Sequence, residues 1–348
     1  MAIHAVIMAG GRGERLWPFS KPDRPKQLHA FGTGKSLIRS TYERLAGMTD
    51  SSRIYVVTGE DIATGIREHL PELPAENILM EPVGRNTAPC IAYAALHISR
   101  KDPDGVMAVF PADHLVGKPG RFHEAIDFGI GCLARRPGLL ITLGLVPDHP
   151  ETGYGYIAPG EALEGAGGLE LRRVLAFREK PDGEKAREYI AQGCLWNAGM
   201  FIWRVGAILE AFRKHLPVMY GQAMAMVSGG EITPGGVSAF YSAVEPVSID
   251  YGIMEKASDA GVIPAEFGWD DIGSWDALGK ALPSDGAGNT CRGEVVVEDS
   301  RGNVVWATGK KIALIGVDDL VVVEGEDAIL VCPRNRSQDV GRLAKKMK

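Results

Sequence analysis

The sequence of 348 residues lacks long apolar runs and any obvious pairing among its cysteines. No uninterrupted apolar segment approaches the ~18 residues that a membrane-spanning helix needs, so we expect no membrane association. The five cysteines are scattered and include no Cys-x-x-Cys pair, which argues against a disulfide framework and against a thiolate metal site. The apolar run Ala5–Ala9 is short and leads directly into glycines, which is typical of a strand and not of a signal peptide. These absences predict a reduced, cytoplasmic protein.

Signatures of hydrolytic chemistry and of nucleic-acid binding are also missing. The eight histidines show no pairing at metal-ligand spacing, and no Gly-x-Ser-x-Gly element occurs, so zinc hydrolysis and serine chemistry have little support. With 38 basic and 44 acidic residues the net charge is −6, which is opposite to the balance expected of a protein that coats nucleic acid. If the substrates are anionic, local basic residues must hold them.

The first 145 residues alternate apolar runs with amphipathic stretches. The expected strands are His4–Ala9, Arg53–Thr58, Ile78–Met80, Val106–Phe110 and Leu139–Leu145. The expected helices are Leu37–Leu45, Asp61–Leu70, Asn86–Arg100 and Phe122–Ala134. Several of the strands lack polar alternation, as strands buried on both faces of a parallel sheet do. The alternation of strand and helix predicts an α/β fold with right-handed crossovers.

The rest of the chain shows two different patterns of expected secondary structure. Residues 150–285 mix strands (Tyr154–Ile157, Leu171–Phe177, Met200–Trp203) and helices (Ala186–Ala191, Ile208–His215, Tyr251–Ala257) without a break in composition. After Ser284, short apolar runs recur at intervals of roughly 8 to 10 residues with Gly and Asp between them, which predicts an all-β coil or meander. A basic, helical tail from Gln338 to Lys348 follows. We therefore predict two domains, 1–285 and 286–348.

A glycine-rich segment, Gly10-Gly11-Arg12-Gly13, directly follows the first expected strand. Glycines there let the backbone approach a ligand closely and direct several N–H groups at an anion. Arg15 and Lys26 lie close behind and suit a polyphosphate, one as a planar fork and one as a point charge. A plain tight turn and a solvated lysine remain the alternatives. The dinucleotide pattern Gly-x-Gly-x-x-Gly is not completed.

A second glycine segment, Gly34-Lys35-Ser36, imitates the end of a P-loop. The full motif requires a glycine five residues before Gly34, where this sequence has His29. The segment therefore predicts no phosphate site.

Carboxylates follow two of the expected strands. Glu81 ends the third strand together with Gly84, at the place where open α/β sheets bind ligands. Asn86 or Thr87, just beyond, could simply cap the next helix. Asp113 follows the fourth strand, where a carboxylate is costly unless it caps a helix or holds a cation.

A magnesium site would need a second acid near Asp113, because Mg²⁺ prefers one or two carboxylates together with substrate phosphates. Asp270 and Asp271 could supply it, although Asp271 or Ser274 could equally cap a helix that starts near Trp275. A third group, Glu179, Lys180 and Asn197, offers acceptors for hydroxyls and a cation for a phosphate, as a phosphorylated polyol requires.

Nine motifs, in order from residue 4 to about 335, together resemble the mannose-1-phosphate guanylyltransferases of the sugar-phosphate nucleotidyltransferase family. The motifs are Gly10–Pro18, Pro25–Gln27, Glu81–Pro89, Pro111–His114, Gly153–Ile157, Glu179–Pro181, Trp196–Phe201, Ser248–Tyr251 and Trp269–Trp275. The resemblance is to the short form, without an appended isomerase domain. Cys90, Arg178 and Asp270 depart from the family pattern, and the last departure points to Asp271 as the metal ligand.

The resemblance implies a Rossmann-like nucleotidyltransferase domain with a mostly parallel sheet, followed by a small β-helix-like domain and a terminal helix. It implies that GTP and mannose 1-phosphate give GDP-mannose and pyrophosphate with the help of Mg²⁺. The implied nucleotide contacts are Ala9, Gly10, Gly11, Gly13, Glu81, Gly84, Asn86 and Thr87, with Arg15 and Lys26 as catalytic cations. The implied metal ligands are Asp113 and Asp271, and the implied sugar-phosphate contacts are Gly155, Glu179, Lys180 and Asn197.

Two other interpretations stay open from the sequence. One is a related enzyme that uses glucose 1-phosphate or a different base, because the choice of sugar depends on a single hydroxyl. The other is a non-catalytic nucleotide-sugar-binding subunit. The presence of all five expected charged groups argues against it, namely Arg15, Lys26, Asp113, Lys180 and Asp271. We expect no nucleic-acid partner and a possible homodimer.

Overall fold

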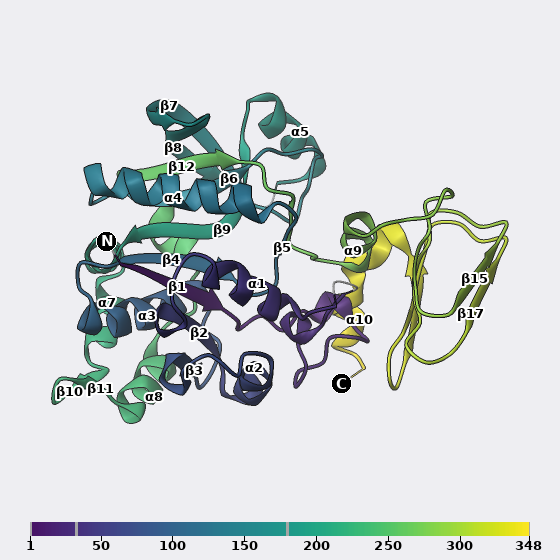
Figure 1. Cartoon of the computed structure of the whole chain (residues 1–348), viewed down its shortest axis with the longest axis horizontal. Coiled ribbons are helices and arrows are strands. Elements are labelled where there is room, and N and C mark those ends of the chain that lie inside the picture. The colour runs from purple at the N-terminus through teal and green to yellow at the C-terminus, as the bar shows by residue number, and fades with distance from the viewer. Residues whose placement is uncertain (1, 32–33, 179–180, 348) are drawn as a thin grey trace.

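The structure is a computed structural model that describes residues 2–31, 34–178 and 181–347. Its main body is a nine-stranded sheet with the strand order β3-β2-β1-β4-β9-β6-β12-β8-β7 (Figure 1). The strands are β1 (Ile3–Met8), β2 (Ile54–Gly59), β3 (Ile78–Glu81), β4 (Val106–Pro111), β6 (Leu140–Leu145), β7 (Tyr156–Ala166), β8 (Leu169–Arg178), β9 (Leu195–Arg204) and β12 (Ala260–Ala265). β3, β2, β1 and β4 pair in parallel, as do β6 and β12, whereas β9 runs antiparallel between β4 and β6. The mostly parallel sheet predicted from the sequence is confirmed.

Helices cover both faces of the sheet and enclose an apolar core on each. One core involves α1 (Leu37–Ala46), α2 (Ala63–His69), α4 (Pro119–Arg135) and α5 (Gly183–Ala191). The other involves α3 (Thr87–Lys101), α6 (Val205–His215), α7 (Pro217–Met224) and α8 (Pro234–Ala243). On β1, Ala5 and Ile7 belong to the first core and Val6 to the second, which explains the continuous apolar run of this strand. None of the helices in the described ranges is long and apolar enough to cross a membrane.

The middle of the chain departs most from the sequence-based expectations. The helix expected over Tyr251–Ala257 is confirmed only in part, because the structure has a single π-helical turn over Asp250–Met254. Strand β12 was not expected, since its sequence contains both Gly261 and Pro264. Pro264 is tolerated because β12 pairs with β8 only at Gly261 and Val262, so the proline needs to donate no hydrogen bond on that side.

The C-terminal part is a coil of short strands. β14 (Thr290–Arg292), β16 (Val304–Trp306) and β18 (Leu320–Glu324) stack in parallel, β19 (Ile329–Pro333) adds an antiparallel edge, and β15 (Val295–Glu298) pairs with β17 (Ile312–Ile315). Asn289 and Asn303 link successive turns, since Asn303 Nδ2 donates to Asn289 Oδ1 at 3.0 Å and its Oδ1 accepts from the Leu320 N–H at 2.9 Å. The expected helical tail is confirmed in part, as α10 (Val340–Ala344) after a 3₁₀ segment Arg334–Asp339.

This coil shares an apolar core with the N-terminal part of the chain. Val304 and Val323 of the coil belong to one buried cluster with Leu16 of the first loop and Trp275 of α9 (Trp275–Ala281). The indole N–H of Trp275 also donates to the carbonyl of Trp17 at 3.0 Å. In Figure 1, α9 and α10 lie between the central sheet and strands β15 and β17. The C-terminal part is therefore packed against the loop that follows β1.

Candidate active site

The expected site residues gather at the carboxyl ends of β1, β3 and β4. A cavity of about 560 Å³ lies there, and it is lined by segments that are distant in the sequence, between Met8 and Asp271. Its lining includes Gly10, Gly11, Glu81, Gly84, Asn86, Thr87, Gly155, Asn197 and Asp271. A second cavity of about 540 Å³, which shares Gly11 with the first, contains Gly13, Arg15, Lys26 and Asp113. These are the predicted nucleotide, sugar and metal residues except Ala9, which is buried and lines neither cavity. Glu179 and Lys180 lie outside the described residues.

Side chains from neighbouring segments anchor the start of the loop after β1. The side-chain amide of Gln27 donates to the carbonyl of Ala9 at 2.8 Å, and the Thr58 hydroxyl donates to the same oxygen at 3.3 Å. Gly13 has a φ of 60°, and a Cβ there would lie 2.5 Å from Cβ of Lys26. Only glycine fits this position, because it allows both the left-handed backbone and the close approach of Lys26.

Lys26 connects three distant motifs. Its side chain is buried, and Nζ donates to Asp113 Oδ2 at 2.9 Å and to the main-chain carbonyl of Asp271. Burial, the largest single cause, would raise the pKa of Asp113, but Lys26, His114 and a backbone hydrogen bond together hold this pKa below its ordinary value. Lys26 therefore brings the Asp113 carboxylate and the backbone of Asp271 to one ammonium group.

Asp271 is oriented by two donors. Its Oδ1 accepts from the Tyr154 hydroxyl and from the Gly273 N–H, both at 2.8 Å. The N-cap of α9 is Ser274, whose hydroxyl accepts from the Ala277 N–H at 3.2 Å, so the capping interpretation does not account for Asp271. The neighbouring Asp270 turns to the Ile272 N–H instead, and burial raises the pKa of Asp270 to about 6.

Glu81 is a buried acid at the wall of the larger cavity. Only 4% of its surface is exposed, and Oε1 has no hydrogen-bond partner among the described residues. Burial raises the pKa of Glu81 to about 7, with the nearby Tyr241 hydroxyl acting in the opposite direction. A carboxylate oxygen in this position at a cavity wall is suited to accept hydrogen bonds from a ligand.

The residues just after Glu81 serve the helix as well as the cavity. Asn86 caps α3, accepting from the Thr87 N–H at 2.8 Å with a φ of 70°, so the capping alternative is correct for its side-chain oxygen. The Thr87 hydroxyl accepts from the Ile249 N–H at 2.9 Å and so fixes the segment that contains Asp250.

Asn197 and Asp250 also line the larger cavity. Asn197 Nδ2 donates to Asp250 Oδ1 at 2.7 Å, and the Asn197 backbone N–H donates to the Gly155 carbonyl at 2.9 Å. Burial raises the pKa of Asp250. Asp250 and Tyr154 lie in motifs that resemble the family, but the sequence alone assigned neither a role. The signal that could have marked them is an acid or phenol within a motif that already carries site residues.

The acids present fit Mg²⁺ better than zinc. No group of three or more His, Cys, Asp or Glu side chains converges within residues 2–31, 34–178 and 181–347. Asp271 lines the larger cavity and Asp113 the smaller one, and both offer hard oxygen ligands. Mg²⁺ takes few carboxylates because substrate phosphates and water complete its shell. The Lys26 ammonium, which contacts the Asp113 carboxylate and the main-chain carbonyl of Asp271, already places one positive charge beside these oxygens.

The chain is similar to known nucleotide-transferring proteins over nearly its whole length. The nucleotidyl transferase family model matches residues 4–287, and a model for the mannoseP isomerase/GMP-like beta-helix domain matches residues 293–347. The mannose-1-phosphate guanylyltransferase of Escherichia coli strain K12 is 37% identical, with 99% of this chain and 73% of the relative covered. That of Klebsiella pneumoniae is 39% identical over 99% of this chain and 73% of its own length. A crystal structure from Thermus thermophilus, described as a mannose-1-phosphate geranyltransferase, has a TM-score of 0.90 at 36% identity, with 100% and 99% of the two chains covered.

Proposed function

Because this chain belongs to the nucleotidyl transferase family and is an enzyme of sugar-phosphate nucleotidyl transfer, we propose that it makes GDP-mannose from GTP and mannose 1-phosphate. A phosphate oxygen of mannose 1-phosphate forms a bond to the α-phosphorus of GTP. The bond from that phosphorus to the oxygen bridging the α- and β-phosphates breaks, and pyrophosphate leaves with its electrons. The observation that carries this proposal is the meeting of Lys26, Asp113 and Asp271 beside the glycine loop.

The reaction needs charge compensation more than proton transfer. Its nucleophile is already an anionic phosphate oxygen, so no general base is required. The barrier comes from repulsion between two polyanions and from charge that builds on the leaving pyrophosphate, and in-line positioning with electrostatic stabilisation lowers it. Arg15 and Lys26 line the smaller cavity, where they would hold the triphosphate against the backbone of Gly11 and Gly13.

Asp113 and Asp271 would hold Mg²⁺, and the chemistry that this ion supplies when bound is neutralisation of phosphate charge. Tyr154 and Gly273 would keep the Asp271 carboxylate aimed at the cavity through the two hydrogen bonds to Oδ1. Lys26 would stay between the acids and the nucleotide, because its contact with Asp113 fixes the position of its ammonium.

Glu81 would select the base. Guanine presents N1–H and N2–H₂ as adjacent donors, and one carboxylate can accept from both. The orphaned Oε1 of Glu81, without a partner among the described residues, supports this role, since these donors would satisfy it. The same hydrogen bonds favour the ionised form, so nucleotide binding would lower the pKa of Glu81 from about 7.

The sugar would lie against Asn197 and the backbone of Gly155, which face the larger cavity. The predicted contacts of Glu179 and Lys180 with the sugar phosphate remain part of this proposal.

The decisive experiment is to measure pyrophosphate release with a matrix of triphosphates and sugar 1-phosphates, with and without Mg²⁺. GTP with mannose 1-phosphate should be the fastest pair and should require the metal. Faster turnover of glucose 1-phosphate or of another triphosphate would replace the proposed substrates. Absence of turnover with every combination of triphosphate and sugar 1-phosphate would refute an enzymatic role for the cavity.

A further inference from the structure

The smaller cavity at the glycine loop is built from both ends of the chain. Its volume is about 540 Å³, and its wall includes Gly341 and Lys345 from the C-terminal helix α10 and its end. These face Arg12, Arg15 and Lys26 from the loop side. The C-terminal helix therefore borders the space in which the triphosphate is proposed to lie.

Four contacts join the C-terminal segment 338–345 to the loop. Arg15 Nη1 donates to Gln338 Oε1 at 2.8 Å, and Lys345 Nζ lies 3.5 Å from Glu14 Oε2. Gly341 packs so closely that a Cβ there would lie 3.1 Å from Cγ of Arg15. Val340 and Leu16 belong to the same buried cluster, which fixes the helix against the loop.

The cavity carries an excess of positive charge. Its wall holds four cationic side chains, Arg12, Arg15, Lys26 and Lys345, and two acids, Glu14 and Asp113. The C-terminal segment meets the Arg15 guanidinium with a neutral amide oxygen, so this contact orients the guanidinium without compensating its charge. A glutamate in place of Gln338 would make an ion pair and would weaken the attraction for an anion.

We propose that the C-terminal helix completes the pyrophosphate site, with Lys345 binding the β- and γ-phosphates of the nucleotide and Gln338 positioning Arg15 for the same group. This inference rests on the proposed function, because it assigns the group that the cavity holds. Pyrophosphate is a compact polyanion that an ammonium and a planar guanidinium can bind together. It also gives the C-terminal part a direct share in substrate binding.

The test uses the full chain and inorganic pyrophosphate as the probe, with binding measured by titration calorimetry in the presence of Mg²⁺. Lys345→Ala should weaken pyrophosphate binding about three- to tenfold, the range expected for one exposed charged contact with a polyanion. Lys346→Ala is the matched control, because Lys346 lines a different groove, beside β19. It removes the same charge from the next position and should leave the affinity unchanged.

Gln338→Glu should weaken pyrophosphate binding by about tenfold and raise the KM for GTP more than it lowers kcat, because it pairs the Arg15 charge. Gln338→Ala removes the hydrogen bond without adding charge and should have a smaller effect. Gln338 and Lys345 are both exposed, so the thermal unfolding midpoint should not change in any of these variants.

The outcomes separate the two proposals. Equal pyrophosphate affinity in wild type, Lys345→Ala and Lys346→Ala overturns the inference even if the enzyme makes GDP-mannose. Weaker binding by Lys345→Ala alone supports it, even if the substrate matrix shows that the reaction is a different one. A wild-type chain that binds no pyrophosphate overturns the inference.

Discussion

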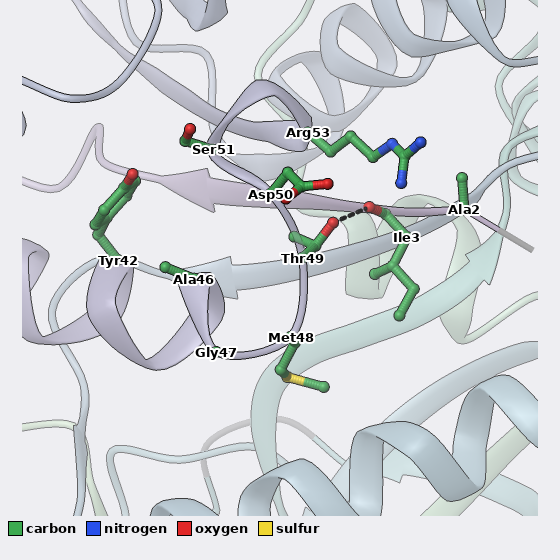
Figure 2. A pocket seen from close by; sticks show the side chains of 10 residues that line it. All are labelled: Ala2, Ile3, Tyr42, Ala46, Gly47, Met48, Thr49, Asp50, Ser51 and Arg53. Atoms are coloured by element: carbon green, nitrogen blue, oxygen red, sulfur yellow. Dashed lines mark hydrogen bonds between the residues drawn. The ribbon is translucent and has the colours of Figure 1, made fainter.

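Two cavities of similar volume, about 560 Å³ each, lie at opposite ends of β1. The one at the amino end, shown in Figure 2, is bordered by the end of α1 and by residues Ala2, Ile3 and Thr49–Ser51. There the Thr49 hydroxyl donates to the Ile3 carbonyl at 2.8 Å, and the charged side chains, Asp50 and Arg53, are exposed to solvent. At the carboxyl end, Glu81 is buried with one oxygen unpartnered among the described residues, and Asp271 is aimed by two hydrogen bonds.

Equal volume thus accompanies very different chemistry. At the carboxyl ends of parallel strands, each crossover begins with a loop, so residues from distant motifs meet there. The carbonyl end of α1 borders the amino-end cavity, and its partial negative charge disfavours an anionic ligand. The orientation of the strands, and not the size of the hollow, distinguishes the candidate site.

The strongest test of this comparison is Asp271→Asn. Loss of one charge that stabilises phosphates should lower turnover by ~10²–10³, since the substitution keeps the shape of the side chain but removes its charge. The measurement is the steady-state rate of pyrophosphate release at saturating GTP, mannose 1-phosphate and Mg²⁺. Asp270→Asn is the matched control and should retain much more activity, because Asp270 bonds to the Ile272 N–H. Unchanged turnover of Asp271→Asn would remove Asp271 from the proposed metal site.

A second test concerns the stability of the protein without ligand. The pKa of Glu81 is raised to about 7 in the folded chain, against ~4.3 for an unperturbed glutamate. The folded state therefore binds the extra proton, and the free energy of unfolding falls as pH rises from about 4 to 7. Glu81→Gln should abolish this loss. The free energy of unfolding of Glu81→Gln, relative to that of wild type, should therefore rise by at most about 3 kcal/mol between pH 4.5 and 7.5.

Denaturant unfolding of the two proteins across that pH range checks this expectation. Glu76→Gln, which alters an exposed glutamate, is a suitable control. Parallel pH profiles for wild type and Glu81→Gln would contradict the assignment of Glu81 as a buried acid whose charge the folded chain leaves poorly compensated.

Glu81→Gln should also reduce the preference for GTP. An amide offers one acceptor and adds donors that face the guanine N1–H and N2–H₂, so we expect the ratio of kcat/KM for GTP over other triphosphates to fall about tenfold. Competition between triphosphates, followed by the sugar nucleotides formed, gives this ratio directly. An unaltered ratio would assign base selection to other groups in the cavity.

The sequence was sufficient to predict the site wherever a functional residue directly follows a strand. Gly10 and Asp113 are of this kind, because a short apolar strand fixes where the next side chains emerge. The family resemblance and the α/β class with its C-terminal β coil, both predicted from the motifs and the apolar runs, are confirmed.

The sequence could not predict the hydrogen bonds that orient the site residues, because these bonds join distant segments of the chain. Tyr154 donates to Asp271 across 117 positions, and Arg15 to Gln338 across 323. No local pattern encodes such pairs, since each depends on how whole elements pack. Strand β12 was missed for a related reason, because the pairing that tolerates Pro264 is a property of the sheet.

The smallest expected effects come from substitutions in the amino-end cavity, and they test whether only the cavities at the glycine loop serve the reaction. Arg53→Ala should leave kcat/KM within about twofold of wild type, because an exposed side chain far from the reacting groups contributes little. Thr49→Ala removes the hydrogen bond to Ile3 and should cost about 1 kcal/mol of stability while leaving kcat/KM unchanged. Both values follow from steady-state kinetics and denaturant unfolding. A tenfold loss of kcat/KM in Arg53→Ala would show that the amino-end cavity also serves the reaction, because Arg53 lines that cavity and not the two at the glycine loop.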